Sequence, residues 1–239
     1  MSPSHTATYA PTRPAPQQGT RIKMCGFTRE ADVLAACTVG ADAIGFVLYP
    51  PSPRSVSIER AAELARLLPA FVTPVLLFVN ETAERIQAAC AAVPGALLQF
   101  HGDESADFCA AMTQLTGRPH LKAARIPLSE VHDFDLLEFA LIHQAAQALL
   151  LDAHVDGYGG GGKTFHWSLL PPNVNAHLVL SGGLTPANVG DGIRALRTHG
   201  LSLAVDVSSG IEAGKGLKDA DKMRQFVQAV RTADNALSF

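Results

Sequence analysis

Short apolar runs recur along the chain, and each ends abruptly in small or polar residues. They occupy residues 21–24, 41–49, 73–79, 96–100, 119–124, 148–151, 177–180 and 201–205. Continuous apolar runs of this kind are typical of strands buried on both faces of a parallel sheet, because a strand with one wet face alternates apolar and polar residues instead. The chain is therefore predicted to contain about eight buried parallel strands, with no hairpin signal between them.

The segments between these runs carry the signatures of helices. The segment that follows Ser57 has apolar side chains at positions 61, 64, 67 and 68, which is the stripe of a helix that packs on a sheet. Similar helices are predicted over about 28–39, 82–93, 105–116, 134–147 and 185–199. Thr28, Ser57 and Thr185 are the expected N-terminal caps of three of them. Strand and helix thus alternate along the chain.

This alternation over 239 residues is compatible with a closed barrel or an open doubly wound sheet. An open nucleotide-binding sheet would need a GxGxxG turn after its first strand, but that turn is Cys25-Gly26-Phe27. The length is also close to the roughly 250 residues of one (β/α)8 barrel. We therefore expect an α/β fold, a single (β/α)8 barrel over residues 21–234. A disordered tail rich in Pro, Ser and Thr is expected to precede it over residues 1–20.

Composition and charge exclude several classes of function. A formal net charge of −3 gives no basis for binding nucleic acid or a membrane surface, and no apolar run approaches the roughly 20 residues of a membrane span. The four cysteines form no CxxC pattern and the nine histidines no HExxH pattern, so no metal site is expected. Widely spaced cysteines suit a reduced compartment, so we expect a cytoplasmic protein.

Two turns near the C-terminus indicate an anion site. A Gly-rich turn at 181–183 follows the seventh apolar run, and a Ser- and Gly-rich turn at 208–210 follows the eighth. Backbone N–H groups in such turns can bind phosphate, and (β/α)8 barrels often build a phosphate site from these two loops. Either turn alone could be an ordinary βα turn that uses glycine for a positive φ. Together they predict phosphate binding by Gly182, Gly183, Ser208, Ser209 and Gly210.

Polar residues collect where the predicted strands end, which is the face that carries the active site in (β/α)8 barrels. They are Cys25, Arg54, Asn80, His101, Asp152 and Asp206. Cys25 and Asp152 can divide the two halves of a proton transfer, because a thiolate of lowered pKa is a base and a carboxyl shielded from water can stay protonated as an acid. Each also has an ordinary structural explanation, as a small buried apolar side chain and as a turn cap.

Three other side chains near this face have two explanations each. Arg54 follows three prolines on a stiff loop and could take a carboxylate through two parallel hydrogen bonds, or be a surface charge. His101 could be catalytic or could satisfy a turn. Lys122 lies on the fifth run and could suggest a Schiff-base enzyme or a barrel-rim residue, although no neighbouring cation is evident that would lower its pKa.

The stretch GYGGGGKT at 157–164 is a literal match to the P-loop pattern G-x-x-x-x-G-K-[ST]. A P-loop needs a helix directly after it, whereas the chain reaches Pro171-Pro172 within two turns. The stretch is better explained as a loop that folds over a ligand, with the glycines as hinges. Lys163 could add a charge near the substrate or be a solvated lysine. A nucleotide hydrolase is kept as an alternative.

A series of motifs occurs in a fixed order along residues 21–230. The first four are RIKMCGFT at 21–28, GADAIGFVLYPPSPRSVS at 40–57, FVN at 78–80 and QFHGDE at 99–104. The others are LLLD at 149–152, GYGGGGKTFHW at 157–167, LSGGLTPANV at 180–189 and AVDVSSGIE at 204–212. In order and spacing this series resembles the phosphoribosylanthranilate isomerase family of tryptophan biosynthesis.

The resemblance implies a cofactor-free (β/α)8 barrel of the ribulose-phosphate-binding type. Its reaction would convert N-(5-phosphoribosyl)anthranilate to 1-(2-carboxyphenylamino)-1-deoxyribulose 5-phosphate by an acid/base Amadori rearrangement. By the same resemblance, Cys25 is the general base and Asp152 the general acid. Arg54 would hold the anthranilate carboxylate, Asp206 and His101 would bind substrate, and the two turns would bind its phosphate.

Two positions depart from the family pattern, and several alternatives stay open. His166 stands where an acidic or amide residue is usual, and Phe100 stands where Leu is usual. Related phosphosugar enzymes are expected to use an Asp pair, or Lys and Glu, in place of Cys25. A dual-substrate enzyme and a non-catalytic phosphate-binding barrel are further alternatives. A small phosphosugar is the expected partner, and a monomer is the default, with a dimer left open.

Overall fold

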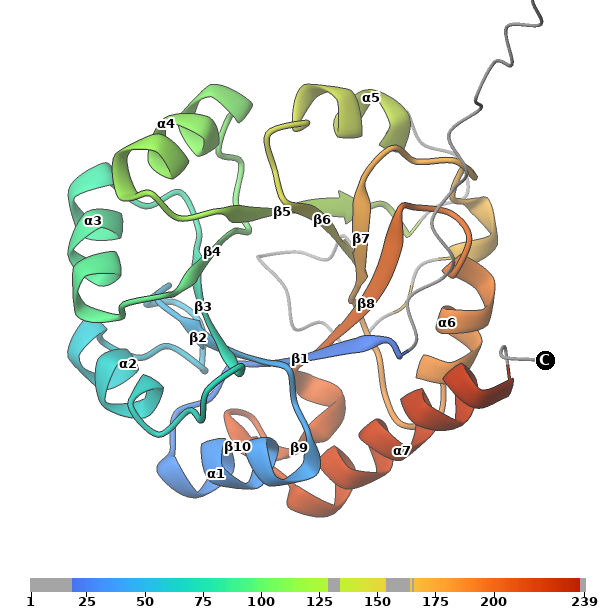
Figure 1. The fold of residues 1–239 in the computed structure, drawn as a ribbon, viewed down its shortest axis with the longest axis horizontal. Helices are drawn as coiled ribbons and strands as arrows, with labels where there is room; N and C mark the ends of the chain where they lie inside the picture. The colour runs from blue at the N-terminus through green and yellow to red at the C-terminus, as the bar shows by residue number, and fades with distance from the viewer. Residues whose placement is uncertain (1–18, 129–133, 154–163, 165, 237–239) are drawn as a thin grey trace, which may run out of the picture.

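The structure is a computed structural model that describes residues 19–128, 134–153, 164 and 166–236. In this part of the chain, eight strands form a closed parallel barrel in chain order, with helices around it (Figure 1). The strands are β1 (Arg21–Cys25), β2 (Ala43–Val47), β3 (Thr73–Phe78), β4 (Leu97–Phe100), β5 (His120–Ile126), β6 (Ala148–Ala153), β7 (His177–Leu180) and β8 (Ser202–Val207). The predicted closed barrel is confirmed.

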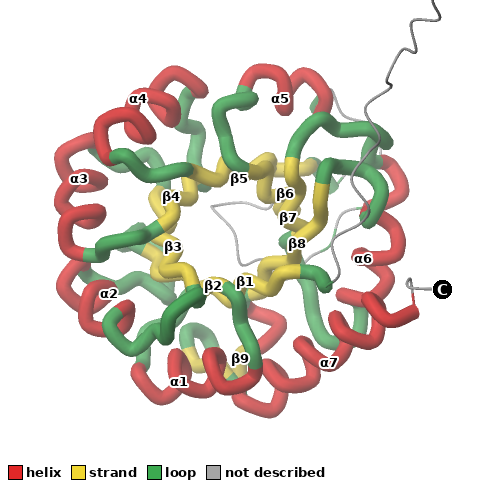
Figure 2. Tube along the Cα trace, viewed as in Figure 1, coloured by secondary structure: helices red, strands yellow, loops and turns green. Residues whose placement is uncertain are grey.

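The helices form an outer ring around the strands (Figure 2). They are α1 (Glu30–Val39), α2 (Ile58–Ala65), α3 (Ala83–Ala92), α4 (Ala106–Thr116), α5 (Leu136–Ile142), α6 (Val189–Leu196) and α7 (Ala220–Ala236). Two short 3-10 helices, η1 (Trp167–Leu169) and η2 (Ser209–Ile211), and two short strands, β9 (Glu212–Gly214) and β10 (Leu217–Lys218), complete the described elements. None of the described helices is long and apolar enough to cross a membrane.

The described helices differ in how their starts are capped. Ser57 caps α2 as predicted, because its side chain accepts the N–H of Arg60. The expected cap at Thr28 is wrong. The helix begins at Glu30, and the Thr28 hydroxyl instead donates to the carbonyl of Gly216, far along the chain. The hydroxyl that would have capped the helix thus makes a tertiary hydrogen bond.

Two differences from the sequence prediction lie in the C-terminal quarter. Helix α6 begins at Val189 and not near 186, because Asn188 accepts the N–H of Thr185 and closes a separate turn before the helix. Strands β9 and β10 pair as a short antiparallel hairpin, which the sequence analysis did not predict. Gly216 allows its turn with a φ of 78°.

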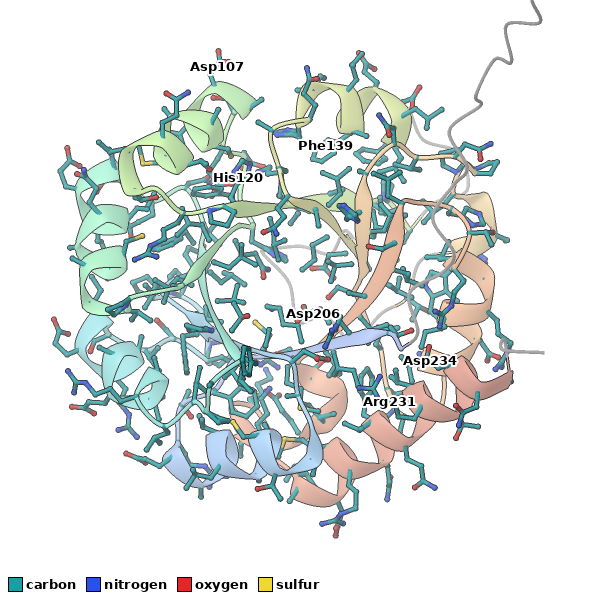
Figure 3. The ribbon with its side chains drawn as sticks, viewed as in Figure 1. Asp107, His120, Phe139, Asp206, Arg231 and Asp234 are labelled. Carbon is teal, nitrogen blue, oxygen red and sulfur yellow. The ribbon has the colours of Figure 1, made fainter. Side chains whose placement is uncertain are left out.

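The apolar core has two layers, separated by the alternation of side chains along each strand. A large cluster fills the space between strands and helices, and Figure 3 shows His120 and Phe139 in that outer layer. Asp206 lies on the inner side of the barrel wall (Figure 3). The inner apolar cluster consists of Leu121, Ala123, Ala148, Leu150 and Val179. Polar side chains continue this inner column toward the carboxyl-terminal ends of the strands.

The start of the barrel is fixed by α7, and this moves the predicted domain boundary. Thr20 is only 1% exposed, and its N–H and hydroxyl donate to the two Asp234 oxygens at 2.7 and 2.6 Å. Arg197 pairs with the same carboxylate. Thr20 therefore belongs to the barrel, which α7 extends to Ala236. The rest of the predicted tail, up to residue 18, lies outside the described residues.

A buried histidine in the outer layer makes stability depend on pH. His143, directly after α5, is 7% exposed and stacks on Phe139 with ring centroids 4.4 Å apart. Burial, with smaller contributions from Lys122 and His120, lowers the pKa of His143 to about 4. The unfolded chain binds a proton there below about pH 6.5, where the folded chain does not. Stability is therefore full above pH 6.5 and falls as the pH drops toward 4.

We predict that His143→Phe flattens this loss of stability. The variant keeps an aromatic ring against Phe139 but has no proton to bind, so the decrease in unfolding free energy between pH 6.5 and 4 should shrink by about 2–3 kcal/mol. Urea titrations across that range measure it. His177→Phe, at an exposed position, is the matched control and should behave as the unchanged protein does. Equal pH slopes in all three proteins would contradict the prediction.

Candidate active site

The carboxyl-terminal ends of the strands bring four sequence-predicted residues to one face. Cys25 ends β1, Asp152 and Asp206 lie near the ends of β6 and β8, and His101 directly follows β4. All four are less than a tenth exposed. They share this face because all strands of a parallel barrel end at the same rim. Their burial in a small volume makes each charge depend on its neighbours.

The thiol of Cys25 is seated against the backbone of β2. A Cβ atom added at Gly45 would lie 2.6 Å from Cys25 Sγ and 3.1 Å from its Cα. Real Cβ atoms do not approach this closely, so only glycine fits at position 45 without a shift of β1 or β2. Gly45, the second glycine of the motif GADAIGF, thus makes room for the thiol.

Burial raises the pKa of the Cys25 thiol. The charge of Lys23 lowers it and the charge of Asp206 raises it, and the net direction is upward. A lowered pKa would suit a base, but the direction is upward because desolvation of the thiolate is the largest effect. The nearby cation of Lys23 is therefore the strongest influence that favours a Cys25 thiolate.

That cation belongs to a buried ion pair across the seam between β1 and β8. Lys23 Nζ lies 2.7 Å from Asp206 Oδ1, and both side chains are about 6% exposed. Ser181 donates to the second Asp206 oxygen at 3.1 Å. Burial opposes the charge of Lys23, but Asp206 and Cys25 outweigh it and raise the pKa of Lys23. Lys23 thus stays an ammonium group beside the thiol.

Asp152 is held from two sides at the end of β6. Its Oδ1 accepts the backbone N–H of Ala153 at 3.0 Å, and its Oδ2 lies 2.9 Å from His101 Nε2. The other ring nitrogen of His101 lies 3.0 Å from Gln99 Nε2. Both ring nitrogens are therefore engaged within the protein, and His101 contacts the predicted acid directly.

The loop that carries His101 is pinned by a second buried ion pair, outside the barrel wall. Lys122 Nζ lies 2.8 Å from both Glu104 Oε2 and the carbonyl of Gly102. Glu104 also accepts the N–H groups of Gly102 and Asn80. Lys122 is 3% exposed and fully engaged with this loop. The geometry favours a structural role over the Schiff-base alternative.

Arg54 reaches the same rim from the loop after β2. Its Nε and one terminal nitrogen each donate at 2.7 Å to a Glu212 oxygen, and Arg54 is 8% exposed. Lys218 donates to Glu212 at 2.9 Å and to the carbonyl of Ser208 at 3.0 Å. The surface-charge alternative for Arg54 is wrong. The two parallel hydrogen bonds that we expected it to make with a ligand are made with Glu212.

The two predicted phosphate turns lie against one another. Gly182 and Gly183 have φ of 74° and 63°, which favour glycine. A Cβ at Gly182 would lie 2.5 Å from the Ala153 nitrogen, next to Asp152. A Cβ at Gly210 would lie 1.9 Å from the carbonyl oxygen of Leu184, in the loop after β7. Glycine at these positions therefore lets the loops after β6, β7 and β8 meet at one place.

The two serines of the second turn have different surroundings. Ser208 donates its hydroxyl to the carbonyl of Cys25 at 3.0 Å, so this side chain ties the turn to β1. Ser209 opens η2. A role of Ser208 in phosphate binding would therefore rest on its backbone N–H.

Several predicted features lie at or beyond the edge of the described residues. The P-loop-like stretch 157–164, with Lys163, lies outside them except for Thr164. His166 is exposed. Phe100, the other departure from the family pattern, is fully buried and packs with Phe78, Phe108 and His120 at centroid distances of 6.3, 6.1 and 5.5 Å. It fills the outer layer behind β4.

Sequence reasoning missed the residues that support the predicted ones. Lys23 and Gln99 precede Cys25 and His101 by two positions, so strand alternation could have placed them on the same inner face. Glu212 and Lys218 gave no such signal, because the contact of Glu212 with Arg54 and that of Lys218 with Ser208 depend on how the end of the chain folds back onto the barrel. In the described part of the chain, no group of three or more His, Cys, Asp or Glu residues is placed to hold a metal ion.

Comparison with known proteins assigns the family. The family model described as N-(5'phosphoribosyl)anthranilate (PRA) isomerase matches residues 22–229. The chain belongs to this family. A relative from Methylibium petroleiphilum, named N-(5'-phosphoribosyl)anthranilate isomerase, is 59% identical over 215 residues, which cover 90% of this chain and 95% of the relative. The resemblance on which the sequence analysis relied is confirmed.

Solved structures agree with this assignment. Phosphoribosyl anthranilate isomerase from Thermotoga maritima is 38% identical, with a TM-score of 0.75, over 89% of this chain and 99% of that one. A second isomerase structure of the family is a complex with reduced 1-(o-carboxyphenylamino)-1-deoxyribulose 5-phosphate. It is 34% identical with a TM-score of 0.71 over the same shares of the two chains.

The close contact between Gly45 and Cys25 gives a direct test of the site. Gly45→Ala should push the thiol or β2 out of place, and we expect at least a tenfold loss of turnover together with a destabilisation of about 1–3 kcal/mol. Steady-state kinetics and thermal unfolding measure the two effects. Gly214→Ala is the matched control, because its added Cβ would meet only Leu217, at 3.9 Å. Unchanged turnover in Gly45→Ala would contradict this account of the thiol.

Proposed function

We propose that this chain isomerises N-(5'-phosphoribosyl)anthranilate to 1-(2-carboxyphenylamino)-1-deoxyribulose 5-phosphate, an Amadori rearrangement of tryptophan biosynthesis. Membership of the isomerase family supports the proposal. The observation that carries it is the pair of proton-carrying groups, Cys25 and Asp152, at the carboxyl-terminal ends of β1 and β6. The proposed route needs no cofactor, because every proton that moves has a carrier among these side chains.

Asp152 acts first, as the general acid. It gives a proton to the ring oxygen of the ribose, and the bond between that oxygen and C1 breaks. The bonding electrons stay with the ring oxygen, while the nitrogen lone pair forms a double bond to C1. The sugar is then an open chain with an iminium group. This step requires that Asp152, which is 5% exposed, holds a proton beforehand.

Cys25 acts second, as the general base. Its thiolate takes the proton from C2, and the electrons of that bond form a double bond between C1 and C2 as the iminium nitrogen becomes neutral. The resulting enolamine gains a proton at C1 and loses one from the C2 hydroxyl, which gives the ketone. Lys23 supplies the positive charge that a buried thiolate needs. Asp206 holds Lys23 in place.

The rest of the rim binds the substrate in this proposal. Arg54 keeps further N–H donors beyond the two that Glu212 accepts, and these would hold the anthranilate carboxylate. Asp206 and His101 position the sugar, His101 through its contact with Asp152. The phosphate would lie on the backbone N–H groups of the turns that contain Gly182, Gly183, Ser208, Ser209 and Gly210.

The related phosphosugar enzymes are the main alternative. Their expected catalysts are an Asp pair, or Lys and Glu, whereas this rim pairs Asp152 with a thiol. Lys122, the one lysine considered for covalent chemistry, is bound to Glu104 and Gly102. Turnover of a histidine-pathway aminoaldose would reveal a second substrate. A nucleotide hydrolase is disfavoured by the family assignment.

We further propose that the chain is a cytoplasmic monomer. Its four cysteines are free, which suits a reduced compartment. Large exposed apolar side chains in the described part are spread over several elements, such as Leu34 on α1 and Leu115 on α4, and three of them, Leu137, Leu141 and Ile142, lie on α5. A structure of a relative from Thermotoga maritima is described as derived from a dimeric isomerase. Sedimentation velocity at micromolar concentration decides between the two states for this chain.

The proposed function is tested with phosphoribosylanthranilate generated in situ, whose anthranilate fluorescence is lost on isomerisation. The unchanged protein should convert it without added metal or nucleotide. Cys25→Ser and Asp152→Asn should each lower kcat by at least about a hundredfold, because each removes one proton carrier. Cys37→Ser on α1, away from the rim, is the matched control and should keep full activity. Normal turnover in either rim variant would overturn the assigned mechanism, and no conversion by the unchanged protein would overturn the function.

A further inference from the structure

A line of three buried side chains runs from the inside of β4 to the acid on β6. Gln99 Nε2 lies 3.0 Å from His101 Nδ1, and His101 Nε2 lies 2.9 Å from Asp152 Oδ2. Gln99 is fully buried, and His101 and Asp152 are 6% and 5% exposed. The carbonyl oxygen of Gln99, Oε1, is also buried and has no hydrogen-bond partner among the described residues. Only the nitrogen of this buried amide is hydrogen-bonded, and a buried polar oxygen without a partner is unusual.

The arrangement matches an ionised Asp152. If the Gln99 amide nitrogen donates a hydrogen bond to His101 Nδ1, then Nδ1 carries no hydrogen. The neutral ring must therefore carry its proton on Nε2. Nε2 then donates to the Asp152 carboxylate. An acid catalyst, however, needs one proton more than this state holds.

A second state of the same three side chains can hold that proton. With one added proton, His101 has a hydrogen on Nδ1, and a further proton is shared between Nε2 and Asp152 Oδ2. The Nδ1–H then needs an acceptor in a place that excludes water. Rotation of the Gln99 amide by a half-turn supplies it, because Oε1 replaces the amide nitrogen. Each end of the amide therefore serves one protonation state.

We propose that Gln99 and His101 are positioning residues that hold the proton of Asp152, and that the Gln99 amide rotates when the free protein gains or loses this proton as the pH changes. This rests on the function proposed above, in which Asp152 is the acid. The shared proton passes to the ring oxygen of the sugar, which leaves Asp152 a carboxylate and His101 neutral with its hydrogen on Nδ1, where Gln99 Oε1 accepts it. The enol hydroxyl returns a proton to the pair when it becomes the ketone, so the pair is restored at the end of turnover.

The proposal predicts opposite pH shifts for two substitutions of one residue. Gln99→Glu offers only acceptors to Nδ1, which stabilises the protonated pair, so the alkaline limb of kcat should move up by about one pH unit or more. Gln99→Met offers no acceptor, so the limb should move down. Gln114→Glu, an exposed glutamine on α4, adds the same charge and should leave the limb unmoved. A purely structural Gln99 would change kcat without moving the limb in opposite directions.

A second measurement needs no variant. In the protein labelled with 15N-histidine, the two His101 nitrogens should report a hydrogen on Nε2 alone at high pH. Nδ1 should gain its hydrogen across the pH range in which kcat rises. A His101 ring that keeps one form throughout that range, or Gln99 variants whose limbs coincide, would overturn the proposal. In that case the proposed function would still stand if Asp152→Asn had lost turnover. Failure of this proposal and failure of the proposed function are therefore distinguishable.

Discussion

The buried ion pair between Lys23 and Asp206 is the interaction on which the site depends. It joins β1 to β8 at the seam where the barrel closes, with 2.7 Å between the charged atoms. Removing one partner from such a pair leaves an uncompensated buried charge, which typically costs about 3–5 kcal/mol. The same pair lies beside the thiol of Cys25, so the residues that join β1 to β8 also influence the charge of that thiol.

Other predicted site residues are also held by buried neighbours. His101 is contacted by Gln99, two positions before it, and Arg54 by Glu212, 158 positions after it. The loop after β4 is held by the ion pair between its own Glu104 and Lys122 of β5. A rim assembled in this way is preorganised, which limits the rearrangement needed when charge develops on a substrate.

Most of the fold could be predicted from the sequence, because apolar runs and the turns after them are local patterns. The apolar runs marked all eight barrel strands. The turns after the seventh and eighth runs predicted an anion site, and Cys25 and Asp152 were singled out because they directly follow apolar runs. Glu212 could not be matched to Arg54, because 158 positions separate them and only the closed barrel brings them together. Thr28 failed as a cap for the same reason, since Gly216 competes for its hydroxyl.

The direction of the Cys25 pKa also lay beyond sequence reasoning, because it depends on how burial and two opposite charges combine. The most direct test of the account is a titration of Cys25 by 13C NMR of its labelled Cβ in the unchanged protein, Lys23→Met and Asp206→Asn. The account predicts that loss of Lys23 raises the pKa of Cys25 and loss of Asp206 lowers it, each by about one pH unit or more. Shifts in the reverse directions, or the same pKa in all three proteins, would contradict it.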